Sequence, residues 1–201
     1  MKRHIPASLL AITLLVGAGH ALAQDRKPMS PRGTAATQVS GKWAAEKAGS
    51  EPRYTGGKWI EIDYGRPIKR GREPLFGSGA EYGKKISDGV PVWRTGANQT
   101  TRLKTEAALE IAGKKLAPGE YSVFVELKEG AWTLVVSTQP AQQKYDPENK
   151  SAIWGSYGYD LKFDVLRAPM KMVKSPYSID QFTIGFLDVI FTKKSGEELL
   201  C

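Results

Sequence analysis

The side chains best suited to binding chemistry lie between Val90 and Arg102, where a tryptophan, an arginine and an asparagine stand close together. Arg94 supplies a guanidinium, and the amide of Asn98 can both donate and accept hydrogen bonds. A small-molecule or sugar site usually combines a few such polar groups with aromatic walls. We therefore predict a ligand site whose residues are Arg94, Asn98, Tyr82, Trp154 and Tyr157.

The same stretch also has a purely structural interpretation. Neighbouring residues on a strand point to opposite faces, so only one of Trp93 and Arg94 can face the core. Tryptophan in a β-sandwich is most often a core residue, and Arg94 would then join strands through a carboxylate such as Glu61 or Asp63. The functional interpretation instead places Arg94 and Asn98 at the mouth of a pocket.

Two carboxylates could support catalysis. Glu61 and Asp63 are two residues apart on a predicted strand, which places them on one face at a separation of about 7 Å. A carboxylate pair can act as acid and base in glycoside hydrolysis, so a hydrolase of envelope sugars is an alternative function. Carboxylates two apart on one strand are common, and we assign no catalytic residue.

The residues that are missing exclude several chemistries. The chain has two histidines, His4 and His20, both close to the amino terminus, and one cysteine, Cys201. Without histidine in the rest of the chain, Ser-His-Asp and Cys-His nucleophile systems are excluded, as are the usual zinc and copper sites. No loop has the spacing of a calcium motif. We expect no metal and no cofactor.

Two loops are further candidates for binding. The loop around Pro67 is basic, and its arginines and lysine lie between glycines: Arg66, Lys69, Arg70 and Arg72. It could hold an anion with guanidinium and free backbone N–H groups, although charge runs usually face water. The polar loop from Gln139 to Ser151 is longer than most connections in compact domains, which is typical of functional loops.

Alternation of apolar and polar residues predicts the elements that position these groups. The predicted strands are Lys58–Tyr64, Val90–Thr95, Thr100–Glu106, Ala107–Ile111, Tyr121–Leu127, Trp132–Val136, Leu161–Val165 and a run that begins at Phe182. No amphipathic helix of three turns is present. About eight or nine short strands at this spacing predict an all-β fold, an antiparallel and jelly-roll-like β-sandwich with little helix.

The amino terminus has the pattern of a secretory signal peptide. Lys2 and Arg3 precede an apolar run, and Ala21-Leu22-Ala23 before Gln24 fits the small-x-small cleavage rule. We expect residues 1–23 to be the signal peptide, residues 24–54 an extended, partly mobile leader, and residues 55–201 a single β-sandwich domain. The apolar run is too short to span a membrane, so we expect an exported protein of the periplasm or the extracellular space, with no membrane span.

Charge and compartment limit the partners. The net charge is +8, but the basic residues are scattered among acids, so acidic partners are favoured only weakly and nucleic acid is not expected. We predict a non-enzymatic protein that binds a small molecule, a glycan or another envelope component. If the fold has no concave site, a purely structural or interaction module becomes the better prediction.

Several sequence blocks resemble a known family. They are Ser30–Arg32, Ile62–Pro67, Val92–Asn98, Gly119–Ser122 and Trp154-Gly155. Together they resemble the bacterial, exported family catalogued as domain of unknown function 2911, and the Trp-Arg-Thr-Gly-Ala-Asn block is the most specific part of the likeness. The resemblance implies an exported, bacterial, β-rich protein. The family has no assigned activity, so the resemblance supplies no catalytic residues.

Overall fold

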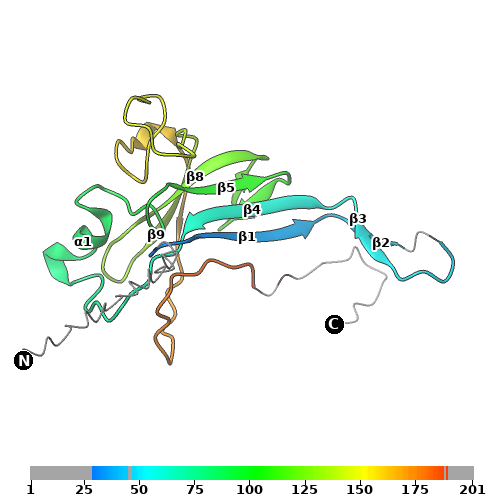
Figure 1. The fold of residues 1–201 in the computed structure, drawn as a ribbon, viewed down its shortest axis with the longest axis horizontal. Coiled ribbons are helices and arrows are strands. Elements are labelled where there is room, and N and C mark those ends of the chain that lie inside the picture. Colours follow the sequence, from blue (N-terminus) through cyan, green and yellow to red (C-terminus); the bar gives the residue numbers. More distant parts are fainter. Residues whose placement is uncertain (1–28, 45–46, 188, 190–201) are drawn as a thin grey trace, which may run out of the picture.

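The computed structural model describes residues 29–44, 47–187 and 189, and its main element is a six-stranded antiparallel sheet with the order β1-β4-β5-β8-β9-β10 (Figure 1). These strands are β1 (Arg32–Val39), β4 (Lys58–Gly65), β5 (Thr101–Thr105), β8 (Gly119–Glu126), β9 (Thr133–Ser137) and β10 (Asp164–Pro169). Two ribbons accompany the sheet: β2 (Lys42–Ala44) with β3 (Arg53–Thr55), and β6 (Leu109–Ile111) with β7 (Lys114–Leu116). The predicted all-β, antiparallel fold is confirmed.

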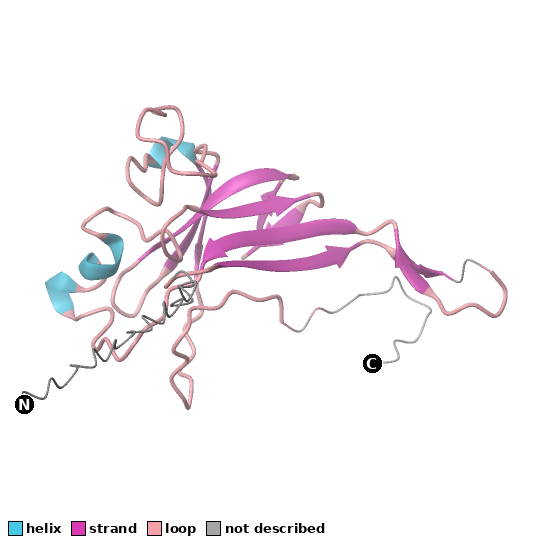
Figure 2. Cartoon of the chain, viewed as in Figure 1, coloured by secondary structure: helices cyan, strands magenta, loops and turns pink. Residues whose placement is uncertain are grey.

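Helical structure is limited to short segments. Among the residues that the structure describes there are one α-helical turn, α1 (Lys84–Ser87), and two 3-10 turns, η1 (Gly79–Glu81) and η2 (Leu161–Phe163). These segments and the long loops lie at one end of the sheet, and the β2–β3 ribbon projects from the other end (Figure 2). No helix in the described part of the chain is long and apolar enough to cross a membrane.

The sheet is buried on both faces because successive side chains of a strand alternate between them. One face carries Leu103, Val123 and Val136, and the β6–β7 ribbon packs on it through Leu116. The opposite face carries Phe124 and Val135, which pack against residues of the loops: Val92, Ile153 and Tyr159. The layers facing the six-stranded sheet are therefore a short ribbon on one side and loops on the other.

The strongest hairpin prediction is confirmed. β8 and β9 pair in register, with Val123 opposite Val136 and Val125 opposite Leu134. Lysine, glutamate and glycine at 128–130 make the turn, as the sequence indicates. Each strand carries three consecutive apolar residues, and each of them meets an apolar partner on the same face of the other strand, which fixes the register.

The predicted strand at Val90–Thr95 is wrong. Only Trp93 pairs with the sheet, through a single bridge to Val125 whose two N–H···O distances are 2.8 and 2.9 Å. Pro91 has no N–H to donate, and Thr95 has a φ of 52°, so the chain turns away on both sides of the bridge. β5 pairs with β8 from Thr101, which lies opposite Val123, and Trp93 pairs with the same strand two residues further along, at Val125.

The sheet begins earlier than the domain boundary predicted at residue 55. β1 lies inside the stretch predicted as a leader, and it pairs with β4 along its whole length, from Arg32 opposite Gly65 to Val39 opposite Lys58. Among the described residues it pairs with β4 alone, and Ala35 is its only buried residue. This explains why its sequence lacks the large apolar residues of a core strand. The predicted signal peptide lies outside the described residues.

The described residues after β10 do not form the strand predicted to begin at Phe182. Instead, residues 181–184 lie across the end of β4, where the N–H of Phe182 donates to the carbonyl of Pro67 at 2.9 Å. The hydroxyl of Tyr64 lies 3.1 Å from the carbonyl oxygen of Ile184 and 2.9 Å from its nitrogen. This crossing brings the carboxyl-terminal part of the chain to the loop end of the sheet.

Candidate functional site

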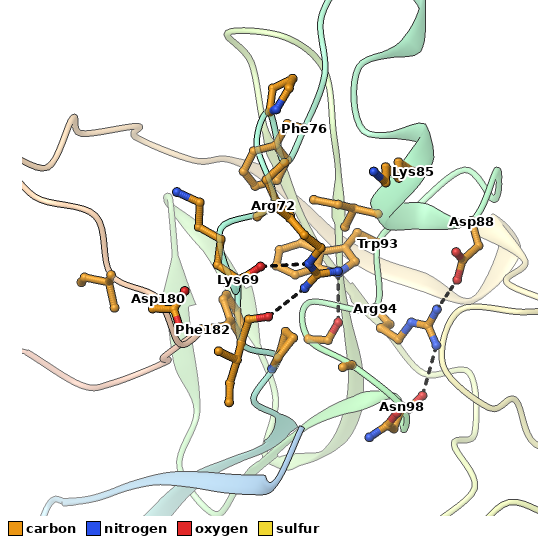
Figure 3. Close-up of a pocket in the computed structure, with 18 of the residues that line it drawn as sticks. Lys69, Arg72, Phe76, Lys85, Asp88, Trp93, Arg94, Asn98, Asp180 and Phe182 are labelled. Atoms are coloured by element: carbon orange, nitrogen blue, oxygen red, sulfur yellow. Dashed lines mark hydrogen bonds and ion pairs between the residues drawn. The ribbon is translucent and has the colours of Figure 1, made fainter. Parts of the chain in front are cut away.

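A cavity of about 440 Å³ opens at the loop end of the sheet, where β4 leads into the basic loop (Figure 3). Its lining comes from four segments that are distant in sequence, namely residues 67–76, 85–88, 93–98 and 179–182, together with Trp132. The volume lies in the range of natural small-molecule sites.

Four aromatic rings form a connected wall of this cavity. Phe182 packs edge-on against Trp93 with ring centroids 5.1 Å apart, and Trp93 packs edge-on against Trp132 at 6.5 Å. The ring of Trp132 in turn packs against that of Phe76, with ring centroids 4.8 Å apart. Trp93 is held in place by its indole N–H, which donates to the carbonyl of Gly96 at 3.0 Å. We call these four residues the aromatic row.

Arg94 is a largely buried side chain that connects two loops. Its Nη2 lies 2.6 Å from Oδ2 of Asp88, and only 13% of its side chain is exposed. The hydroxyl of Tyr157 donates to the same carboxylate oxygen at 2.8 Å, and the guanidinium carbon lies 5.4 Å from the centre of the Tyr157 ring. The charge of Arg94 is therefore already matched. Trp93 is buried, as in the structural interpretation, but the carboxylate partner of Arg94 is Asp88 rather than Glu61 or Asp63.

Asn98 holds the turn against the start of β1. It has a φ of 63°, which asparagine tolerates better than most residues, and its amide donates to the carbonyl of Ser30 at 3.4 Å. The backbone carbonyl of Asn98 accepts a hydrogen bond from Nη1 of Arg94 at 3.3 Å. The turn also packs closely against β4, since a Cβ built on Gly65 would lie 1.9 Å from the carbonyl oxygen of Ala97. The Trp-Arg-Thr-Gly-Ala-Asn block is thus fixed by close backbone packing.

The remaining cations of the cavity are Lys69, Arg72 and Lys85. Lys69 is paired with Glu73, and this hydrogen bond lowers the pKa of the Glu73 carboxyl below its ordinary value. Arg72 donates from Nε to the carbonyl of Lys69 at 3.0 Å and from Nη2 to that of Ile68 at 2.8 Å. Within the described part of the chain, neither Arg72 nor Lys85 has a carboxylate partner.

A second cavity of about 530 Å³ lies within the loops between β9 and β10. The buried amide of Gln142 organises it by donating to the carbonyls of Asn149 and Ala152 at 3.0 and 2.9 Å. The same side chain accepts from the N–H of Asp146 at 2.8 Å. The long polar loop singled out in the sequence is therefore folded around one glutamine.

A family model described as a protein of unknown function, DUF2911, matches residues 47–198, which is more than half of the chain. The chain belongs to this family. The matched region of this DUF2911 protein includes both cavities. No curated protein and no solved structure matches the chain.

The five predicted site residues of the DUF2911 chain are divided between the two cavities. Arg94 and Asn98 line the first, whereas Trp154 and Tyr157 line the second. Tyr82 lines neither, because its hydroxyl accepts from the indole N–H of Trp132 at 2.9 Å and its ring stacks on Phe76, behind the aromatic row. Tyr157, which lines the second cavity, contacts Arg94 and Asp88, which line the first.

Sequence reasoning did not assign the aromatic row, Arg72 or Lys85 to the ligand site. Trp132 and Phe182 each sit in an alternating pattern that predicts strands, so nothing local distinguishes them from core residues. Arg72 belongs to the basic loop in which the sequence analysis considered an anion site, and this was the one available signal. Glu61 and Asp63 line neither cavity. Asp63 instead accepts from Thr34 at 2.6 Å.

Proposed function

We propose that this DUF2911 protein is an exported, non-enzymatic protein that binds a small molecule with a ring-shaped or otherwise apolar body in the first cavity. The observation that carries the proposal is the aromatic row around a space of about 440 Å³. Aromatic walls with a few polar groups are typical of sites for small molecules and single sugar units. Export is supported by the signal-peptide pattern of residues 1–23.

The hydrolase alternative has less support. A glycosidase needs two carboxyl groups that face one cleft from opposite sides of the substrate. The carboxylates that line the first cavity, Asp88 and Asp180, already accept hydrogen bonds, from Arg94 and Tyr157 and from the N–H of Arg70 respectively. The structural-module alternative was favoured for a fold with no concave site, and two cavities are present in the described part of the chain.

A ligand screen by thermal shift, followed by affinity measurement through tryptophan fluorescence, tests the proposal. Phe76→Ala removes one ring of the row, and we expect it to weaken binding of any hit by about tenfold or more, because a buried aromatic contact is worth roughly 1.5 kcal/mol or more. Tyr145→Ala is the matched control, since Tyr145 is an aromatic residue of the second cavity.

The two variants separate the outcomes. A ligand that loses affinity in Phe76→Ala and keeps it in Tyr145→Ala supports the proposal. The reverse pattern would move the site to the second cavity. A broad screen of sugars and small organic compounds that yields no stabilising ligand would count against small-molecule binding altogether.

A further inference from the structure

The positive charges of the first cavity are not all matched by negative ones. Lys69 is paired with Glu73, and Arg94 with Asp88. The other carboxylate of the cavity, Asp180, lies on the side of Lys69, away from Lys85 (Figure 3). Within the described residues this leaves the guanidinium of Arg72 and the ammonium of Lys85 without a carboxylate partner.

We propose that the ligand is an organic acid whose acidic group binds Arg72 and Lys85 while its apolar body lies against the aromatic row. This inference rests on the proposed function and names the class of ligand. It places the acidic group of the ligand at Arg72, a residue of the basic loop in which the sequence predicts a possible anion site, and at Lys85, rather than at Arg94.

Arg72 is oriented before any ligand arrives. Two of the five N–H groups of its guanidinium donate to backbone carbonyls of residues 68 and 69, which holds the planar group in one orientation. Carbonyl partners do not neutralise the charge, and the remaining N–H groups stay available for a carboxylate or sulfonate. A guanidinium held in this way loses little side-chain entropy when it binds an anion.

Lys85 approaches the same cavity from α1 (Figure 3). Its neighbour Lys84 is paired with Glu81 at 2.8 Å, so the two adjacent lysines of α1 have different environments. A flexible ammonium and a fixed guanidinium that line one cavity suit an anion that the guanidinium anchors and the ammonium adjusts to. Arg94 contributes little further attraction because Asp88 already accompanies it.

Two matched dyes test the inference. 8-Anilinonaphthalene-1-sulfonate and N-phenyl-1-naphthylamine share one aromatic body, and only the first carries an acidic group. We expect the wild-type protein to bind the sulfonate at least about tenfold more tightly, because charge-assisted hydrogen bonds are the stronger ones. Energy transfer from tryptophan to each dye, reduced in Trp132→Phe, reports binding beside the aromatic row.

The variants are Arg72→Gln and Lys85→Gln, with Arg70→Gln and Lys84→Gln as controls of equal charge change outside the cavity lining. We expect each cavity variant to weaken the sulfonate about 10- to 100-fold and to change binding of the neutral dye less than about twofold. The controls should leave both dyes within about twofold. All four residues are exposed, so the variants should fold, which circular dichroism verifies.

Failure of the inference can be distinguished from failure of the proposed function. If both dyes bind beside the aromatic row with equal affinity, and the cavity variants change neither, the cavity binds apolar ligands and the organic-acid inference is wrong. If the controls weaken the sulfonate as much as Arg72→Gln does, general surface charge attracts it and the assigned residues are wrong. If neither dye binds, the proposed function fails and this inference fails with it.

Discussion

The ion pair between Arg94 and Asp88 connects the turn at 93–98 to the loop at 154–158 through Tyr157. The two partners differ in exposure, with 13% of the arginine side chain and 46% of the aspartate side chain accessible. An unmatched charge is more unfavourable where less water reaches it. Removing Asp88 should therefore destabilise the fold mainly because the less exposed guanidinium of Arg94 loses its carboxylate partner.

We expect Asp88→Ala to lower the free energy of unfolding by about 1–3 kcal/mol, the usual loss for an unsatisfied buried partner. Glu81→Ala, which breaks the exposed pair with Lys84, should change it by less than about 0.5 kcal/mol. Urea denaturation measures both. If the two variants lose equal free energies of unfolding, the Arg94–Asp88 ion pair stabilises the fold no more than the exposed pair does.

A second cluster of charged side chains connects β8 to β10, the strands on either side of β9. Arg167 pairs with Glu126 and lies 2.7 Å from Oδ2 of Asp164, and the hydroxyl of Tyr159 donates to that same oxygen at 2.6 Å. Burial of the phenol, together with its hydrogen bond to the Asp164 carboxylate, raises the pKa of Tyr159 to about 12. Both effects favour the neutral phenol over the phenolate.

This pKa shift predicts a loss of stability in alkali. The pKa of Tyr159 is higher in the folded protein than the ordinary value of 10.0, so the unfolded chain loses the proton first as the pH rises. The stabilisation is present below about pH 10 and disappears between about pH 10 and 12. Urea denaturation across this range should show a steeper fall in stability for the wild type than for Tyr159→Phe. Parallel curves would contradict the assignment.

At the scale of elements, the turn at 93–98 is fixed by contact between backbones. Gly96 has a φ of 155° and Gly65 lies directly beneath Ala97. We expect Gly65→Ala to destabilise the protein by about 3 kcal/mol or more, because the new methyl group would overlap a carbonyl oxygen 1.9 Å away and the backbone must move. Thermal unfolding monitored by circular dichroism measures the change.

Gly185→Ala is the control for this substitution. Among the described residues, its new Cβ would meet Cδ2 of Leu187 at 3.9 Å and no other atom within 4 Å, and the site needs no left-handed backbone. We expect a change within about 0.5 kcal/mol, as for most surface substitutions. If the two glycines tolerate alanine equally, the close packing of the turn on β4 is not a constraint on the fold.

The loop between β9 and β10 depends on Gln142. Gln142→Ala removes three hydrogen bonds to the loop backbone, so we expect faster hydrogen exchange and proteolytic cleavage between residues 143 and 151. Binding of a ligand in the first cavity should not change, since Gln142 does not line it. Gln143→Ala, an exposed neighbour, is the control. Unchanged exchange in Gln142→Ala would contradict this role.

At the scale of the whole molecule, one sheet with two covered faces supports loops that gather at one end (Figure 2). If the protein is exported as proposed, the secreted product should begin at Gln24. Amino-terminal sequencing of material from the periplasm or the medium measures this. An intact amino terminus in the cytoplasm would contradict export.

The sequence by itself determined the all-β fold and the β8–β9 hairpin. Alternation is a local property, and strands such as Lys58–Gly65 and Gly119–Glu126 show it without reference to distant residues. The sequence also limited the chemistry, since both histidines lie near the amino terminus. The strand predicted at Val90–Thr95 failed because Pro91 and the positive φ of Thr95 interrupt pairing that alternation alone suggests.

Only the tertiary structure decided which residues share a cavity and which charges are matched. Phe76, Trp132 and Phe182 come from loops and a strand end far apart in the chain, and folding alone brings their rings together around Trp93. Whether a guanidinium is available to a ligand depends on its neighbours in space. Arg94 lies beside Asp88, whereas the hydrogen bonds of Arg72 within the described chain go to backbone carbonyls. No local pattern encodes that difference, because it arises from contacts between distant segments.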